Sequence, residues 1–302
     1  MRSALITGAC GFIGKNLVSE LLSSGYRVFA TDLPESSPFE KNARLTYISC
    51  DLMKETPRGI PVGECEVLYH LAWCGVSPEA RENFDLQMKN FSLSQNAVKL
   101  AKTLGIKTVI FVGSTMEYSF CEGKISEKSA PSPLNLYAAA KLSVRYLCES
   151  LARLSGIAFR YAVITSIYGR GREDGNIIYY CIRELFEKRS PRLSPCKQIW
   201  DFIHIEDATR ALRLIGEKGR ASFYAVGTGE NRPLSDTVNL ISGLIDKNIP
   251  VKFGAIPYGD SGIINSAVNT QSLRRDTGFK PKYSLDVGIR QLIDYYKKEF
   301  RT

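Results

Sequence analysis

Short apolar runs alternate with helical stretches through the first half of the chain. Runs of four to seven apolar, β-branched and aromatic residues predict strands, and apolar stripes at helical spacing predict helices. The predicted strands cover residues 4–7, 27–31, 45–48, 67–71, 108–112 and 158–164, and the predicted helices cover 12–24, 81–104 and 136–154. Because these strands are almost continuously apolar and alternate with helices, we predict an α/β fold with a doubly wound parallel sheet, the Rossmann arrangement.

After about residue 166 the alternation loosens, and prolines punctuate shorter elements. We therefore predict a dinucleotide-binding Rossmann domain over residues 1–165 and a smaller substrate-binding lobe over 166–302. The segment near 200–228 holds another apolar run, 222–226, which we expect to return to the main sheet. The sequence contains no low-complexity linker and no internal repeat.

Composition and charge narrow the possible functions. The 302 residues are 44% apolar, which suits a globular protein with a large core. The net charge of +9 comes from dispersed lysines and arginines. It therefore favours anionic small molecules, or a merely basic surface, over nucleic acid. No apolar run is long enough to span a bilayer. The N-terminal segment is interpreted as a strand and not as a signal peptide, so a cytoplasmic location is expected.

Cysteine and histidine usage gives little reason to expect a metal. The eight cysteines form no C-x-x-C pair, and the two histidines, His70 and His204, lie far apart in the sequence. Metal sites usually need closer grouping of such ligands. We expect buried thiols and no metal site.

Glycines stand three residues apart in the loop between the first predicted strand and the first predicted helix. Glycine permits the tight turn and lets the backbone approach a pyrophosphate, and the N-terminus of the helix supplies amide donors. The strand–turn–helix context makes this a dinucleotide-binding motif. The expected cofactor contacts here are Gly8, Gly11, Phe12, Ile13 and Gly14.

An acidic residue, Asp32, ends the second predicted strand, 18 residues after Gly14. A carboxylate there accepts hydrogen bonds from ribose hydroxyls and repels a 2′-phosphate, so we expect NAD and regard NADP as less favoured. The alternative is that Asp32 only caps a turn before Pro34. Asp51 and Leu52 follow the third strand and are expected to flank the adenine.

A tyrosine and a lysine open the helix predicted over 136–154. Tyr137 and Lys141 are four residues apart, so they share one helical face. An ammonium near a phenol stabilises the phenolate, which makes the tyrosine a proton donor or acceptor near neutral pH. Ser114 follows the fifth predicted strand, where side chains face the ligand crevice of such sheets. We expect Ser114 to bind the reacting oxygen, and the alternative is a turn serine.

Together these elements resemble the extended short-chain dehydrogenase/reductases, the nucleotide-sugar epimerase/dehydratase family. The segment 7–14 is close to that family's T-G-x-x-G-F-I-G signature, and residues 70–72 resemble its H-L-A segment. Residues 167–169 resemble its V-Y-G turn, and 201–207 its D-F-x-x-V-x-D segment. The resemblance spans essentially the whole chain. It implies an NAD-dependent enzyme, a nucleotide-diphosphate sugar as partner, and a homodimer formed through the two long helices.

The resemblance also assigns individual residues. It implies catalytic roles for Ser114, Tyr137 and Lys141, and it adds Leu71, Ala72 and Asn90 to the expected cofactor-binding residues, together with Tyr137 and Lys141. The expected substrate-binding residues are Thr115, Met116, Glu117 and Asn176, together with Arg170 and Arg232 as candidate phosphate partners, for which the alternative is merely solvated charge.

The two residues that follow Ser114 narrow the range of possible reactions. Dehydratases of this family carry Asp-Glu there, whereas this chain has Thr115 and Met116, which cannot transfer protons as a carboxyl pair does. The G-S-x-x-E-Y pattern is more similar to deoxysugar 4-ketoreductases. We expect reduction of a 4-keto group or oxidation of a 4-hydroxyl. A 4-epimerase that retains NAD and a non-catalytic dinucleotide-binding regulator are the alternatives.

Overall fold

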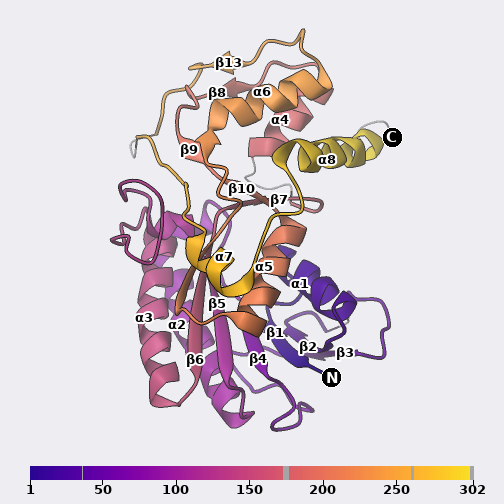
Figure 1. Ribbon diagram of the computed structural model, residues 1–302, viewed down its shortest axis with the longest axis vertical. Coiled ribbons are helices and arrows are strands. Elements are labelled where there is room, and N and C mark those ends of the chain that lie inside the picture. The colour runs from indigo at the N-terminus through magenta and orange to yellow at the C-terminus, as the bar shows by residue number, and fades with distance from the viewer. Residues whose placement is uncertain (36, 173–176, 260–261, 300–302) are drawn as a thin grey trace.

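The computed structural model describes residues 1–35, 37–172, 177–259 and 262–299. The chain is elongated, with a large sheet-and-helix part at one end and a smaller, mostly helical part at the other (Figure 1). The N-terminal half builds most of the large part, and α4 (Ile177–Phe186), α6 (Leu234–Ile245) and α8 (Leu285–Glu299) gather in the small part. The predicted division into two domains at residue 165 stays a prediction.

Seven strands form one sheet in the order β11-β6-β5-β4-β1-β2-β3, and every neighbouring pair is parallel. They are β1 (Ser3–Thr7), β2 (Arg27–Asp32), β3 (Leu45–Ser49), β4 (Val67–His70), β5 (Thr108–Ser114), β6 (Ala158–Ile164) and β11 (Phe223–Val226). The strand order reverses direction between β1 and β4. The predicted doubly wound α/β fold is confirmed, and β11 brings a segment of the C-terminal half to the edge of the sheet beside β6.

Helices cover both faces of this sheet because successive strand residues point to opposite sides. Leu5 and Leu68 lie in a core cluster with α2 (Phe84–Thr103) and α3 (Leu136–Leu154). Their neighbours Ile6 and Tyr69 lie in a second cluster with α1 and α5 on the other face. The helices of that face are α1 (Phe12–Ser23), α5 (Ile205–Lys218) and the short α7 (Gln271–Thr277).

The smaller part has its own core, in which Ile182, Val238 and Ile289 are buried. Its helices are α4 (Ile177–Phe186), α6 (Leu234–Ile245) and α8 (Leu285–Glu299). Three two-stranded sheets complete it: β7 (Ser166–Tyr168) with β10 (Phe202–His204), β9 (Ile199–Trp200) with β12 (Arg232–Pro233), and β8 (Arg192–Leu193) with β13 (Lys252–Phe253). The connection between the parts is held by Asp201, a fully buried carboxylate that accepts hydrogen bonds from the backbone N–H groups of Thr228 and Gly229.

All eight cysteines are free. Within the described ranges, no three His, Cys, Asp or Glu side chains are grouped so that they could hold a metal ion. None of the helices described here combines the length and the apolar character needed to cross a bilayer.

One glycine inside α5 is required by packing. A methyl group on Gly216 would overlap the hydroxyl of Tyr69, a fully buried side chain of β4. Glycine to alanine in a helix interior ordinarily stabilises by about 1 kcal/mol, but overpacking costs about 1–3 kcal/mol. We expect Gly216→Ala to lower the free energy of unfolding by up to about 2 kcal/mol in urea titrations.

Gly243 in α6 provides the matched control, because nothing lies within 4 Å of a methyl group placed there. Gly243→Ala should raise the free energy of unfolding by up to about 1 kcal/mol. Equal stabilisation by both substitutions would show that Gly216 is not constrained by Tyr69.

Candidate active site

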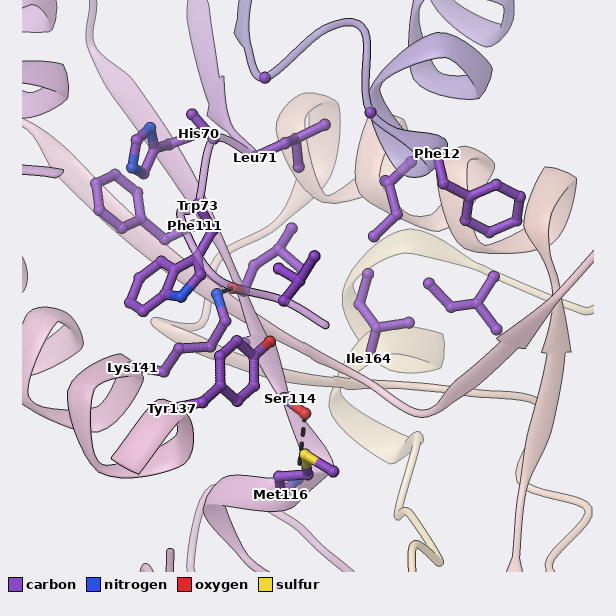
Figure 2. Close-up of a pocket in the computed structure, with 18 of the residues that line it drawn as sticks. Phe12, His70, Leu71, Trp73, Phe111, Ser114, Met116, Tyr137, Lys141 and Ile164 are labelled. Atoms are coloured by element: carbon purple, nitrogen blue, oxygen red, sulfur yellow. Dashed lines mark hydrogen bonds between the residues drawn. The ribbon is translucent and has the colours of Figure 1, made fainter. Parts of the chain in front are cut away.

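A cavity opens at the carboxyl ends of β1, β4 and β5, where the strand order reverses. In open α/β sheets this point is where ligands bind. The cavity has a volume of about 400 Å³. Its lining runs from the glycine loop after β1 to the first turns of α3, and Figure 2 shows Phe12, Leu71, Ser114, Tyr137 and Lys141 around it.

The glycine loop is packed too tightly for any larger residue at two positions. Gly8 has φ of +73°, and a methyl group there would overlap the backbone of Ala72. A methyl group on Gly14 would overlap the carbonyl of Gly8. Gly11 is the N-cap of α1. Because glycine has no side chain, no side-chain oxygen accepts from the first N–H groups of the helix. This arrangement suits a phosphate group.

Apart from Tyr137 and Lys141, eleven residues were expected to bind the cofactor; seven of them line the cavity, and four do not. The lining residues are Gly8, Gly11, Phe12, Ile13, Gly14, Leu71 and Ala72. Asp32, Asp51, Leu52 and Asn90 are not part of the lining.

Asp32 lies at the end of β2, where its carboxylate accepts hydrogen bonds from the N–H groups of Cys10 (2.7 Å) and Leu33 (2.8 Å). It thereby ties the strand end to the glycine loop. Each carboxylate oxygen has a second lone pair, so these bonds leave capacity for ribose hydroxyls. The cofactor role of Asp32 stays a prediction.

Asp51, Leu52 and Asn90 are engaged in local structure. The carboxylate of Asp51 accepts from the N–H of Met53 and pairs with Lys54. Leu52 is buried in the core under α2. Asn90 is fully buried, and its side-chain amide bonds both the N–H (2.7 Å) and the carbonyl (3.0 Å) of Cys74. Asn90 therefore fixes the loop after β4, which forms one wall of the cavity.

The three residues expected to be catalytic lie together at the cavity wall. Ser114 ends β5, and its hydroxyl accepts a hydrogen bond from the N–H of Met116 (3.2 Å). Tyr137 is in the first turn of α3, whose N-cap Asn135 accepts from the N–H of Ala138. Lys141 follows one turn later on the same face, as Figure 2 shows.

Lys141 carries the ammonium of this pair, and the residue is almost completely buried, with 8% of its surface exposed. It donates a hydrogen bond to the carbonyl of Val112 (3.0 Å) and lies 3.7 Å from the ring centre of Trp73. The ring centre of Tyr137 is 5.4 Å away. A carbonyl dipole and an aromatic face thus replace water around this cation.

Burial dominates the proton affinities of this pair. It raises the pKa of the Tyr137 phenol, and ionised Glu117 raises it further. Arg81 and a hydrogen bond from Ser114 act in the opposite direction on the pKa of Tyr137. Burial lowers the pKa of Lys141, whereas the negative charge of Glu117 raises it. Burial and Glu117 outweigh Arg81 and Ser114, so the pKa of Tyr137 without cofactor lies above its ordinary value, and not near neutral pH as the spacing of Tyr137 and Lys141 led us to expect.

Glu117 lies beneath the site and does not line the cavity. It has no exposed surface, its carboxylate accepts from the N–H of Ser114 (2.6 Å), and both oxygens lie 2.9 Å from the hydroxyl of Tyr161. The expectation that Glu117 binds substrate does not match this placement. Ser114-x-x-Glu117 forms a capping box around the short helix Thr115–Glu117, a signal that is visible in the sequence.

The other residues expected to bind substrate are dispersed. Met116 lines the cavity, whereas Thr115 is beside it and outside the lining. Arg170 is exposed and lies over the ring of Tyr295 (5.2 Å). Arg232 pairs with Glu230 (2.6 Å) in β12. Asn176 lies outside the described residues.

Trp73 and Arg81 also line the cavity and were not predicted from the sequence. The ammonium of Lys141 lies over the ring of Trp73 in a cation–π contact, and the indole N–H of Trp73 donates a hydrogen bond to the side chain of Gln87 (3.1 Å). Arg81 lies over the ring of Tyr137, 5.6 Å from its centre. Trp73 lies in the connection between β4 and α2. Arg81 lies in the short 3-10 helix Ala80–Glu82, which precedes α2, whereas the long helix was expected to begin at residue 81.

Family comparison agrees with this geometry. Residues 4–227 match the NAD dependent epimerase/dehydratase family. The chain belongs to that family. The predicted resemblance and the expectation of an NAD-dependent enzyme are thereby confirmed.

Relatives at low identity span the whole chain. CDP-abequose synthase of Salmonella muenchen is 24% identical over 302 residues, which cover 97% of each chain. A dTDP-6-deoxy-L-talose 4-dehydrogenase (NAD(+)) of Aggregatibacter actinomycetemcomitans is 25% identical and covers 84% of this chain and 94% of its own. The solved structure of UDP-N-acetylglucosamine 4-epimerase from Methanobrevibacter ruminantium M1 matches with a TM-score of 0.85, 21% identity and 99% coverage of both chains.

His70 gives the fold a testable pH dependence. The imidazole is buried between the hydroxyls of Thr7 (2.7 Å) and Ser94 (3.0 Å). Burial, with a contribution from Lys141, lowers the pKa of His70 to about 3 from 6.5. Below pH 6.5 the unfolded chain therefore binds a proton that the folded chain does not. The neutral, buried His70 therefore does not lower the free energy of unfolding above pH 6.5, and it lowers it progressively as the pH falls below 6.5.

We expect the free energy of unfolding to fall by about 2 kcal/mol from this residue between pH 7.5 and 5.0. Urea titrations at both values, compared with His70→Gln, isolate the effect. The variant should be less stable at pH 7.5 but should lose about 2 kcal/mol less on acidification. Identical pH dependence in both proteins would show that His70 is not buried as a neutral imidazole.

Proposed function

We propose that the protein is an NAD-dependent oxidoreductase that reduces the 4-keto group of a nucleotide-activated sugar, or oxidises the 4-hydroxyl in reverse. One observation carries the proposal: a phenol and a buried ammonium, Tyr137 and Lys141, share the wall of a cavity that also opens onto a glycine phosphate loop. The two relatives named for CDP-abequose synthesis and for a sugar 4-dehydrogenation support a nucleotide sugar as the substrate class.

The cavity fits a dinucleotide. The N–H groups of Gly8, Ala9, Cys10 and Gly11 already donate to oxygens of the loop and of β2, so the first turn of α1 supplies the amide donors for a phosphate. Among the described lining residues there is no Asp or Glu to repel phosphates. Residues of the loop would hold the pyrophosphate, and Lys141 lies where it can contact a ribose. NAD, when bound, exchanges a hydride with the sugar carbon.

The chain's own groups manage the proton. In reduction, Tyr137 donates its phenolic proton to the keto oxygen, and the hydroxyl of Ser114 orients that oxygen. Lys141 and Arg81 stabilise the phenolate that remains, because each places a positive charge within 6 Å of the ring. In oxidation the phenolate removes the proton from the 4-hydroxyl.

Removal of the phenolic oxygen tests this assignment. Tyr137→Phe eliminates the proton donor, so we expect kcat to fall by at least about 100-fold, while the dissociation constant for NAD changes little. Absorbance at 340 nm with a nucleotide 4-keto sugar measures turnover, and fluorescence titration measures cofactor binding.

Tyr146→Phe is the matched control, since Tyr146 lies on the exposed side of the same helix. It should turn over like the wild-type enzyme. Turnover of Tyr137→Phe within a few-fold of wild type would refute the role of Tyr137 in proton transfer.

A 4-epimerase that keeps its NAD is the close alternative, and the fold match to a UDP-N-acetylglucosamine 4-epimerase is the observation that favours it. A reductase consumes external NADH mole for mole with product, whereas an epimerase consumes none. A non-catalytic regulator would bind NAD without any absorbance change, and it would not need the Ser114, Tyr137 and Lys141 cluster.

We also propose a cytoplasmic homodimer built on α2 and α3. Eight free cysteines suit a reducing compartment. Exposed apolar side chains mark both helices: Phe84, Met88, Leu136, Tyr146, Leu147 and Leu154. On α2, the apolar residues Leu93, Ala97 and Leu100 pack into the core. The exposed apolar side chains on the outer face of α2 and α3 are therefore available to contact a partner subunit.

Charge on that surface tests the dimer. Leu147→Asp combined with Leu154→Asp should convert the protein from dimer to monomer in light scattering after gel filtration, because like charges would meet across a two-fold interface. Both side chains are more than half exposed, so the monomer should remain folded. An unchanged dimer, or a monomeric wild type, would contradict this interface.

A further inference from the structure

The tyrosine end of the cavity carries positive charge that no described carboxylate in the lining balances. Arg81, Lys141 and Arg172 are the cationic lining residues. Lys141 donates a hydrogen bond to the carbonyl of Val112 and lies over the ring of Trp73. Arg172 lies at the glycine-loop end of the cavity, over the ring of Phe12 (5.5 Å).

Arg81 differs because its guanidinium has no described counterion. None of the ion pairs among the described residues includes it, and its buried Nε has no hydrogen-bond partner there. The guanidinium lies over the ring of Tyr137 (5.6 Å), but a ring face does not satisfy its N–H donors, and leaving a buried donor unbonded is costly. Its planar arrangement of donors matches the two oxygens of a carboxylate or a phosphate.

The backbone around Arg81 is fixed in place. Gln87, which is 2% exposed, donates hydrogen bonds to the carbonyls of Gly75 and Ala80 (both 2.9 Å). The N–H of Arg81 bonds the carbonyl of Ser77 (3.0 Å). Because Gln87 also accepts from Trp73, one buried amide positions both the platform under Lys141 and the segment that carries Arg81. The arginine is therefore presented to the cavity by a rigid support.

We propose that Arg81 is a substrate-binding residue that receives an anionic group of the nucleotide sugar beside Tyr137. The inference rests on the proposed function and extends it, since it requires substrate oxygens with negative charge at the reacting end of the cavity. Two sources share this chemistry: a carboxylate on the sugar ring and the oxygens of the diphosphate.

Calorimetric titration of the NAD-loaded protein tests the subsite. The probes are UDP-glucose, CDP-glucose, dTDP-glucose and UDP-glucuronate. Arg81→Gln should weaken binding at least tenfold, and Arg81→Lys should recover part of the loss because it keeps the charge without the planar donors. NAD binding should be unchanged in both variants, which also shows that they fold. Arg153→Gln, an exposed residue of α3 away from the cavity, is the control and should bind as wild type.

The pattern of losses identifies the anion. A loss confined to UDP-glucuronate assigns Arg81 to a sugar carboxylate, and an equal loss for the neutral hexoses assigns it to the diphosphate. Unchanged affinity of both variants for a probe that wild type binds overturns the subsite alone. Failure of the wild type to bind any of the four probes contradicts the proposed function, and the subsite with it.

Discussion

The site depends on keeping an ammonium ion out of water and next to a phenol. Lys141 is stripped of most of its hydration, which lowers its pKa, and it is stabilised by the Val112 carbonyl and the face of Trp73. These partners are backbone dipole and π-electrons, so they hold the cation without neutralising it. A carboxylate in direct contact would pair with the ammonium and remove its influence on Tyr137. Gln87 holds the indole of Trp73 in place and thereby supports this cation.

The one buried carboxylate nearby is kept at a distance by its own hydrogen bonds. Glu117 is committed to the N–H of Ser114 and the hydroxyl of Tyr161, and burial raises its pKa. It therefore anchors the end of β5, and its charge favours both a protonated lysine and a protonated tyrosine. A methyl group on Gly113 would overlap the ring of Tyr161, so the strand and this support are closely fitted. The serine that orients substrate thus has its place fixed from below.

Much of this could be predicted because periodicity and spacing are local. Continuous apolar strands, the glycine loop and the four-residue spacing of Tyr137 and Lys141 depend on neighbours in the chain. Trp73 and Arg81 could not be predicted, because their inward orientation depends on Gln87 and Asn90 pinning an irregular loop from a later helix. Glu117 was expected to bind substrate, but its capping-box geometry turns it into the core.

The central claim is that Tyr137 is a phenol whose proton is controlled by the charges that surround it, and it can be tested without knowledge of the sugar. The measurement is a ¹³C NMR titration of tyrosine labelled at Cζ, with Tyr137→Phe to identify the signal, in the presence and absence of NAD⁺. Burial should keep the pKa of Tyr137 above its ordinary value of 10 without cofactor, and the positive nicotinamide should lower it by at least about one unit. A pKa of Tyr137 that is the same with and without bound NAD⁺ would contradict the account.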